Sequence, residues 1–307
     1  HLRTPAQPRR SGRLPRRRHR GDRLTFFLVV VSAGIATGAA FALVATGFVV
    51  IHRVTRVVNF AQGVFSVLAG MACYSLLDHG VPHGLAEILA VAIAALVGLG
   101  VGVLAIGRPG IPPLASLIVT LGVGVLSYAL VIFFWGDGPL SFSMLQGQLS
   151  VAGATMQWQY VLIVGVTAVT FAGLMFFFDR TYLGKALTAC YSNPHAARLV
   201  GINVTRMGLI AFAIGGALGG VAGVLLTPLQ PVEFDSDVAI AINGFAAAIF
   251  GGLLRPGTAL VGGLVLGVAE ALVAGYSRYA SLQSGVALVL ILAIMIYRAS
   301  REPEGAE

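Results

Sequence analysis

Long, uninterrupted apolar runs constrain this chain more than any other feature of its sequence. Hydrophobic residues make up 57% of the 307 positions and charged residues only 10%, whereas roughly a quarter of the residues in soluble domains are charged. The runs are continuous and not alternating, which excludes the strands of a transmembrane barrel. Because lipid offers the backbone no hydrogen-bond partners, such a chain must fold as a bundle of transmembrane helices.

We therefore expect an all-α, Gly-rich bundle of about nine spans, within a range of eight to ten. Most runs come close to the ~20 residues that a helix needs to cross a bilayer. The predicted spans are 24–51, 57–77, 84–107, 114–135, 159–178, 207–226, 238–254, 258–276 and 282–297. They form one predicted membrane domain over residues 24–298, between a basic tail at 1–23 and a polar tail at 299–307.

The net charge of +8 comes from the N-terminal tail alone. Residues 1–23 hold nine arginines and one acid, and the remaining chain holds eleven basic and eleven acidic residues. The charge is therefore no indication of a nucleic-acid partner, and we expect none. The tail is rich in Pro and Arg, so we expect it to be disordered. It is either an arm that lies on anionic membrane lipid or an extension without a function.

The basic residues of the short loops indicate the orientation of the chain. If the spans alternate, one side receives Arg53, Arg56, Arg108, Arg180, Lys185, Arg198, Arg206, Arg255, Arg298 and Arg301. The other side receives Asp78, Glu87, Asp137, Glu233, Asp235 and Asp237, with Arg278 as its only base. The basic side, which includes the loop 180–206, is then cytoplasmic. Nine spans would leave the Arg-rich tail outside, so either residues 24–51 include a re-entrant turn near Gly34–Gly38 or the tail is not native.

A polar segment, residues 180–201, joins two of the apolar runs and is expected to form two short helices. Asn193 suits the N-cap of the second helix, Pro194 its first position, and Gly201 the left-handed turn that ends it. Residues 194–200 would then form a compact helix at the membrane surface. Three basic side chains surround it: Lys185, Arg198 and Arg206. A helical loop of this kind is suited to docking a soluble partner.

A few polar residues lie inside the predicted spans and are candidates for a substrate pathway. Asn59 and Gln62 precede Gly63 and either line a broken helix or hold two helices together by hydrogen bonds. Glu270 is an intramembrane carboxylate, with either a structural partner or a role in proton coupling. Asn243 is a further pathway candidate.

The outer loop 228–237 carries Glu233, Asp235 and Asp237 without a base. It either meets a basic patch on an external partner or is simply a solvated loop.

Enzymatic activity and metal binding have little support in the sequence. No Ser/His/Asp or His-Glu-x-x-His arrangement occurs. Gly184-Lys185 is followed by Ala186 where a Walker A motif requires Ser or Thr. His79 and His83 are separated by Gly80 and Pro82, which opposes a helical metal pair. We expect no catalytic residue, no metal and no bound cofactor on this chain.

Taken together, the polar and glycine-rich segments resemble the LivH-type permease subunit of the branched-chain amino acid ABC importers, from about residue 30 to 297. Ordered sequence blocks carry the resemblance: Arg56-Val57-Val58-Asn59-Phe60-Ala61-Gln62-Gly63, Gly184-Lys185-Ala186, Asn193-Pro194, Ala197-x-Leu199-x-Gly201-Ile202, Gly219-Gly220-Val221-Ala222-Gly223-Val224-Leu225, Phe250-Gly251-Gly252 through Gly257, Gly262-Gly263 and Ala269-Glu270-Ala271.

The resemblance implies an importer permease of a bacterial inner membrane that performs no bond chemistry itself. Its implied partners are a LivM-type permease or a second copy of this chain, two cytoplasmic ATPase subunits that bind the ATP, and an extracytoplasmic solute-binding protein. The loop corresponding to 184–201 is the family's coupling segment, which sits in the ATPase cleft. The implied coupling residues are Gly184, Lys185, Asn193, Pro194, His195, Ala197, Arg198, Leu199 and Gly201.

Two departures from the family leave the substrate open. The family usually has His where this chain has Gln62, and an acidic residue where this chain has Phe65. Relatives handle branched-chain amino acids, other amino acids, amides or urea, and small organic acids. The competing hypotheses are a secondary transporter that uses Glu270 as its proton site, and a membrane enzyme or purely structural subunit.

Overall fold

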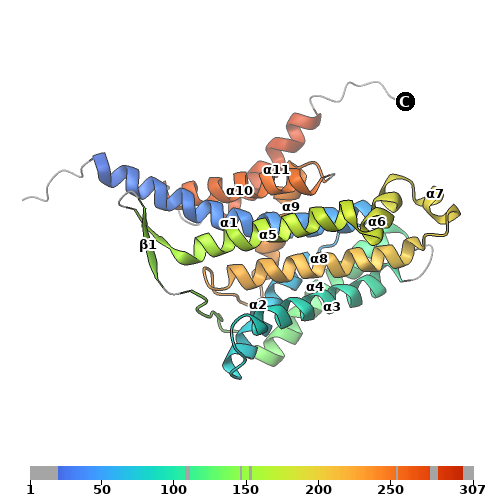
Figure 1. Cartoon of the computed structure of the whole chain (residues 1–307), viewed down its shortest axis with the longest axis horizontal. Coiled ribbons are helices and arrows are strands. Elements are labelled where there is room, and N and C mark those ends of the chain that lie inside the picture. The colour runs from blue at the N-terminus through green and yellow to red at the C-terminus, as the bar shows by residue number, and fades with distance from the viewer. Residues whose placement is uncertain are drawn as a thin grey trace, which may run out of the picture.

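Most helices of the computed structural model lie along one direction, which runs across Figure 1. The structure describes residues 20–107, 111–145, 147–151, 154–253, 255–276 and 283–299. Its helices are α1 (Arg20–Thr55), α2 (Gln62–Asp78), α3 (Leu85–Ile106), α4 (Pro113–Trp135), α5 (Trp158–Arg180), α6 (Tyr182–Ser192), α7 (Pro194–Leu199), α8 (Val204–Leu226), α9 (Ser236–Phe250), α10 (Pro256–Tyr276) and α11 (Gln283–Ala299).

Each of the nine predicted spans contains an observed helix. Within the described residues, six helices are long and apolar enough to cross a membrane: Thr25–Thr55 of α1, and α3, α4, α5, α8 and α10. The other three are shorter, since α2 has 17 residues, α9 has 15, and the apolar part of α11 covers Gly285–Ile294. The helical membrane bundle is therefore confirmed, and the count of nine spans stays a prediction.

Helix α1 corrects two expectations. It begins at Arg20, inside the predicted tail, and runs without a break past Gly34 and Gly38, so of the two alternatives the re-entrant turn is wrong. These glycines instead let α1 approach α10, because a Cβ at Gly34 would lie 2.8 Å from the carbonyl oxygen of Gly267. Close glycine contacts of this kind stabilise helix pairs in lipid. Residues 1–19 and 300–307, Arg108 and Arg278 lie outside the described residues.

The structure also contains a small β-hairpin, so the all-α prediction is wrong at this point. Strand β1 (Gln148–Val151) pairs antiparallel with β2 (Ala154–Gln157), with Gln148 opposite Gln157. Polar and apolar residues alternate over 148–151, which is the period of a strand. The hairpin lies at the end of the bundle opposite α6 and α7 (Figure 1).

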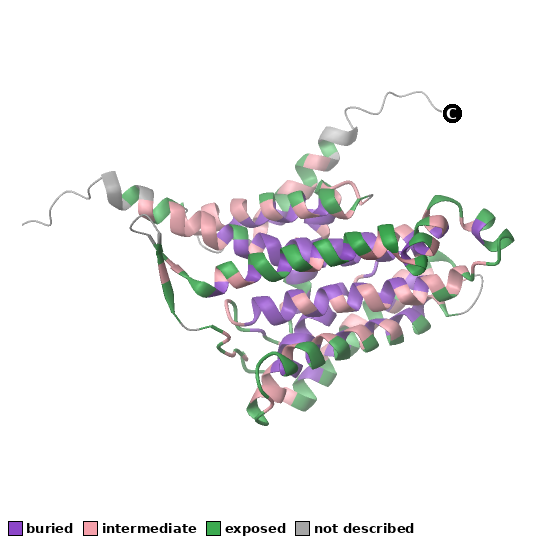
Figure 2. Cartoon of the chain, viewed as in Figure 1, coloured by how far each residue is buried: buried purple, intermediate pink, exposed green. Residues whose placement is uncertain are grey.

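The core of the bundle forms around α1 and α8. Figure 2 shows buried residues concentrated along the middle of α1, the start of α2 and most of α8. Glycines allow the close contacts, for example between Gly98 of α3 and Gly216 of α8. In contrast, α4 and α5 leave large apolar side chains exposed along much of their length, as helices that face lipid or another membrane subunit do.

Candidate functional site

One end of the bundle carries most of the described basic loop residues, and we call it the basic end: Arg53, Arg56, Arg180, Lys185, Arg198, Arg206 and Arg255. They come from the last turn of α1, the end of α5, helices α6 and α7, the start of α8 and the turn before α10. The short helices α6 and α7 project from this end in Figure 1.

The local structure of α7 confirms the predicted caps. The side-chain oxygen of Asn193 accepts hydrogen bonds from the backbone N–H groups of His195 and Ala196, both at 3.0 Å. Pro194 occupies the first helical position, and Gly201 follows the helix with a φ of 84°. An Asn cap contributes about 1 kcal/mol to a helix, so residues 194–199 are well defined despite their exposed position.

Helix α6 begins with a cap that the sequence analysis missed. Thr181 accepts a hydrogen bond from the Gly184 backbone N–H at 3.0 Å. A Cβ at Gly184 would overlap the carbonyl oxygen of Phe177, so glycine allows α6 to fold back tightly against the end of α5. The signal was present in the sequence, since Thr181 stands three residues before Gly184 as an N-cap residue should.

Helices α6 and α7 present a mixed cationic and apolar surface to their surroundings. Lys185, His195 and Arg198 are exposed, and they stand beside Leu199, whose exposed fraction is 78%. Ala197 is buried and anchors the inner side of α7. A large exposed apolar side chain among cations is typical of a contact with another protein.

The Tyr191 ring of α6 lies against the guanidinium groups of Arg53 and Arg56, and these contacts connect α6 to the end of α1. The guanidinium carbons of Arg53 and Arg56 lie 4.2 and 5.5 Å from the ring centroid of Tyr191, within the range of a cation–π interaction. Arg56 also donates a hydrogen bond to the Tyr191 carbonyl oxygen at 3.4 Å. The sequence analysis assigned no role to Tyr191, because nothing local indicates that it meets residues 135 positions away.

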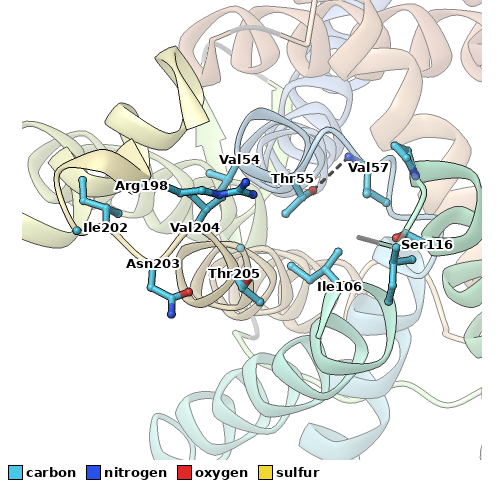
Figure 3. Close-up of a pocket in the computed structure, with 14 residues that line it drawn as sticks. Val54, Thr55, Val57, Ile106, Ser116, Arg198, Ile202, Asn203, Val204 and Thr205 are labelled. Atoms are coloured by element: carbon cyan, nitrogen blue, oxygen red, sulfur yellow. Dashed lines mark hydrogen bonds between the residues drawn. The ribbon is translucent and has the colours of Figure 1, made fainter. Parts of the chain in front are cut away.

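A groove of about 600 Å³ lies next to α7. Figure 3 shows the Arg198 side chain between Val54 and Val204, directed into this groove, with Ile106 and Ser116 on its far side. The groove thus joins α7 to the ends of α1, α3, α4 and α8. It makes α7 part of a surface to which four long helices contribute.

The chain re-enters the bundle after α1. Arg56 has a φ of 61°, a left-handed conformation that non-glycine residues rarely adopt, and it ends the helix. Residues 57–61 are not helical, and α2 then begins inside the protein at Gln62, which is fully buried. Asn59 therefore lies in a non-helical segment between α1 and α2, and its role in a substrate path stays a prediction.

Asn59 and Gln62 are occupied with contacts inside the protein. Asn59 accepts a hydrogen bond from the Ala61 backbone at 3.1 Å and donates one to Gln62 at 3.5 Å. Gln62 donates to the carbonyl oxygen of Gly215 in α8 at 2.9 Å. Phe65 is also fully buried, and a Cβ at Gly219 would lie 3.0 Å from its Cβ. The two departures from the family therefore lie in the contact between α2 and α8.

Asp237 does not belong to an exposed docking surface, which corrects the sequence prediction. It lies in the first turn of α9 with an exposed fraction of only 5%, and a Cβ at Gly63 would overlap its backbone carbonyl oxygen. The α2–α9 contact therefore draws Asp237 into the interior. Glu233 and Asp235 are exposed and remain available to an external partner.

The last two pathway candidates lie on two different helices, α10 and α9. Glu270 is buried in α10, and its Oε1 has no hydrogen-bond partner among the described residues. Asn243 is half-buried on α9, one to two turns beyond Asp237. The described hydrogen bonds do not join Glu270 or Asn243 to Asn59 and Gln62, which bond to each other, to Ala61 and to Gly215 of α8.

The chain matches one family model over most of its length and is similar to several permease proteins. The family model described as "Branched-chain amino acid transport system / permease component" matches residues 30–295. The chain is 28% identical over 293 residues to the high-affinity branched-chain amino acid transport system permease protein LivH of Escherichia coli (strain K12), covering 89% of this chain and 95% of that protein. It is 28% identical to the corresponding permease protein BraD of Pseudomonas aeruginosa, over 86% of this chain and 92% of the relative. It is 29% identical to a probable LivH of Methanocaldococcus jannaschii, over 81% of each chain.

Proposed function

The chain belongs to the branched-chain amino acid transport permease family, and we propose that it is the membrane-spanning subunit of an ATP-driven importer of branched-chain or related amino acids. It is a multi-pass inner membrane protein, as the family and the apolar helices indicate. The observation that carries the mechanism is the projecting, capped pair α6 and α7 at the basic end. It offers a separate ATPase a structured element to hold.

In this mechanism, α7 fits into the ATPase subunit. The mixed surface of Lys185, His195, Arg198 and Leu199 makes the contact, while Asn193 and Pro194 hold the helix in shape. Ala197 anchors its inner side, and Gly184 and Gly201 form the turns that bound the segment. ATP is bound and hydrolysed on the partner subunits, and this chain needs no cofactor for its role.

The Tyr191 contact supplies a route from the ATPase to the translocation path. A movement of α6 acts on Arg53 and Arg56 through the Tyr191 ring. Arg56 is the hinge at which the chain turns into the non-helical segment before α2. Displacement of α6 would therefore shift the buried start of α2. A helix that begins inside the protein is the kind of element that transporters use beside their substrate.

The remaining parts of the assembly follow from the exposed surfaces. The apolar faces of α4 and α5 would meet lipid and a second permease subunit, either LivM-type or a copy of this chain. Glu233 and Asp235, at the end opposite the basic end, would meet a solute-binding protein. By the positive-inside rule the basic end is cytoplasmic. The nine-span arrangement then requires α2, α9 and α11 to complete the crossings together with the six long helices.

Reconstitution in liposomes with the ATPase subunits and the solute-binding protein tests this proposal. We expect uptake of labelled leucine that requires ATP and continues when the proton gradient is collapsed. Arg198→Glu should remove the ATPase subunits from the purified complex, because it reverses the charge at the proposed contact. Uptake that follows the proton gradient and needs no ATPase would instead indicate a secondary transporter.

A further inference from the structure

A cavity of about 450 Å³ lies between α4, α9 and α11, beside the segment that precedes α2. Its walls contain the aromatic residues Phe60, Tyr128 and Phe245. They also contain aliphatic residues, among them Val125, Ile242 and Leu288. Asp237 is the only acid among the described lining residues, and none of those residues is basic. The volume is within the range of small-molecule sites, which are mostly apolar with a few polar groups.

The cavity lies beside the middle of α4. Its α4 residues run from Leu121 to Tyr128, which is the centre of a helix that extends from Pro113 to Trp135. Its α11 residues, Leu288 and Ile291, likewise lie in the apolar part of that helix. Transporters commonly bind substrates beside discontinuous helices. Here the discontinuity is the start of α2, which touches Asp237 through Gly63.

The Asp237 carboxylate lacks a cation. The residue is 5% exposed, and its Oδ1 has no hydrogen-bond partner within the described part of the chain. The Tyr128 hydroxyl is the neighbouring side-chain donor. A carboxylate in an apolar environment is costly unless a positive charge or several donors compensate for it. Asp237 itself lines the cavity, which leaves room for a ligand that brings the missing charge.

We propose that Asp237 binds the ammonium group of a solute with an apolar body, and that the cavity holds that body. Phe60 and Tyr128 add aromatic rings, which attract an ammonium ion through their faces. The aliphatic walls suit a branched hydrocarbon side chain. This inference rests on the proposed function for the identity of the solute, a branched-chain amino acid, but it assigns a site and a recognition chemistry that the function alone does not.

The position of the cavity's mouth would let a solute enter from the exposed side of the chain. Val125, Val238 and Leu288 line it and are themselves exposed, with exposed fractions of 69%, 48% and 55%. It therefore opens on the side of the chain that a second permease subunit would cover. A solute held by Asp237 would sit between the two subunits.

The first test compares Asp237→Asn with Asp78→Asn in the complete transporter. Both substitutions remove one charge, but Asp78 is exposed. We expect Asp237→Asn to lower uptake of labelled leucine at least tenfold, because a buried charge pair contributes several kcal/mol. Asp78→Asn should keep uptake within about twofold of the wild type, as surface charges contribute little. Wild-type uptake in Asp237→Asn would overturn the proposal and leave Asp237 as a residue that stabilises the first turn of α9.

The second test does not depend on transport and covers the case in which Asp237→Asn misfolds. In Val238→Cys, a maleimide labels the new thiol at the mouth of the cavity. The native Cys73 and Cys190 are buried and should not react. Isopentylamine, which carries the ammonium and the branched body, should slow the labelling. Isopentanol, which lacks the charge, should not. Equal labelling with both compounds would overturn the proposal.

The two proposals fail in different ways. If the wild type takes up no amino acid with ATP, yet isopentylamine protects Val238→Cys, the importer function is wrong and the ammonium site stands. If the wild type takes up leucine, yet Asp237→Asn does so equally well, the importer function stands and the site is wrong.

Discussion

The basic end and the buried start of α2 and α9 are built in opposite ways. At the basic end, α6 and α7 are held by contacts between near neighbours, such as the cap of Asn193, which accepts a hydrogen bond from the backbone N–H of Ala196 three residues on. At the buried start, Gln62 bonds to α8 over 153 positions, and Gly63 touches Asp237. The first region is a local structure exposed to a partner. The second exists only because three distant segments meet.

This difference separates two kinds of functional residue. A projecting helix can be recognised by composition and caps, because each residue acts close to its neighbours in sequence. A binding site in the membrane depends on which polar groups are left without a partner after packing. Gln62 and Asp237 both lie inside the protein, yet Gln62 is bonded and Asp237 retains a free oxygen. The same comparison orders the expected effects of substitutions.

The largest expected effect concerns the side of the membrane from which a reagent can reach α7. His195→Cys should be labelled by a membrane-impermeant maleimide in inside-out vesicles and not in spheroplasts, because His195 is exposed at the basic end. The native thiols should not be labelled, because Cys73 and Cys190 are buried. Burial also raises the pKa of the Cys190 thiol. Asp235→Cys is the matched control and should give the opposite pattern. Labelling of His195→Cys from outside would refute the coupling role.

Gly63→Ala should destabilise the protein by roughly 1–3 kcal/mol, the usual effect of adding a carbon to a packed core. Its Cβ would overlap the Asp237 carbonyl oxygen, so α2 or α9 must move. Gly165→Ala in α5 is the control, because a Cβ there meets nothing within 4 Å and alanine favours a helix. Thermal unfolding in detergent compares the two. Equal melting temperatures would mean that the α2–α9 contact is loose.

Asn193→Ala should reduce the stability of α7 by about 1 kcal/mol through loss of its cap. Because α7 is the proposed ATPase contact, solute transported per ATP should fall severalfold while the protein still folds. Asn203→Ala removes an equivalent cap from α8, where Asn203 accepts a hydrogen bond from the Arg206 backbone. It should leave the transport ratio closer to that of the wild type. The same loss in both variants would argue against a special role for α7.

Glu270→Gln should have the smallest effect, with uptake within about twofold of the wild type. An importer that draws its energy from ATP does not need a proton site, and the substitution keeps the shape of the side chain. Loss of uptake in this variant, together with dependence on the proton gradient, would support the secondary-transporter hypothesis. Uptake measured with and without an uncoupler separates these outcomes.

The sequence by itself determined the class of protein and the local helices of the basic end. Continuous apolar runs leave the backbone no alternative to helices in lipid, and caps such as Asn193 act over a few residues, so both can be recognised without a structure. Ordered sequence blocks carried the family resemblance, and the family model that matches residues 30–295 confirmed it.

Only the tertiary structure decided what the interior polar residues do. It placed Gln62 and Phe65 against α8, kept α1 continuous past Gly34, and turned Asp237 from a loop acid into a buried one. None of these follows from neighbouring residues, because burial and pairing depend on segments more than a hundred positions apart meeting in one place. That meeting leaves the Asp237 carboxylate beside an apolar cavity.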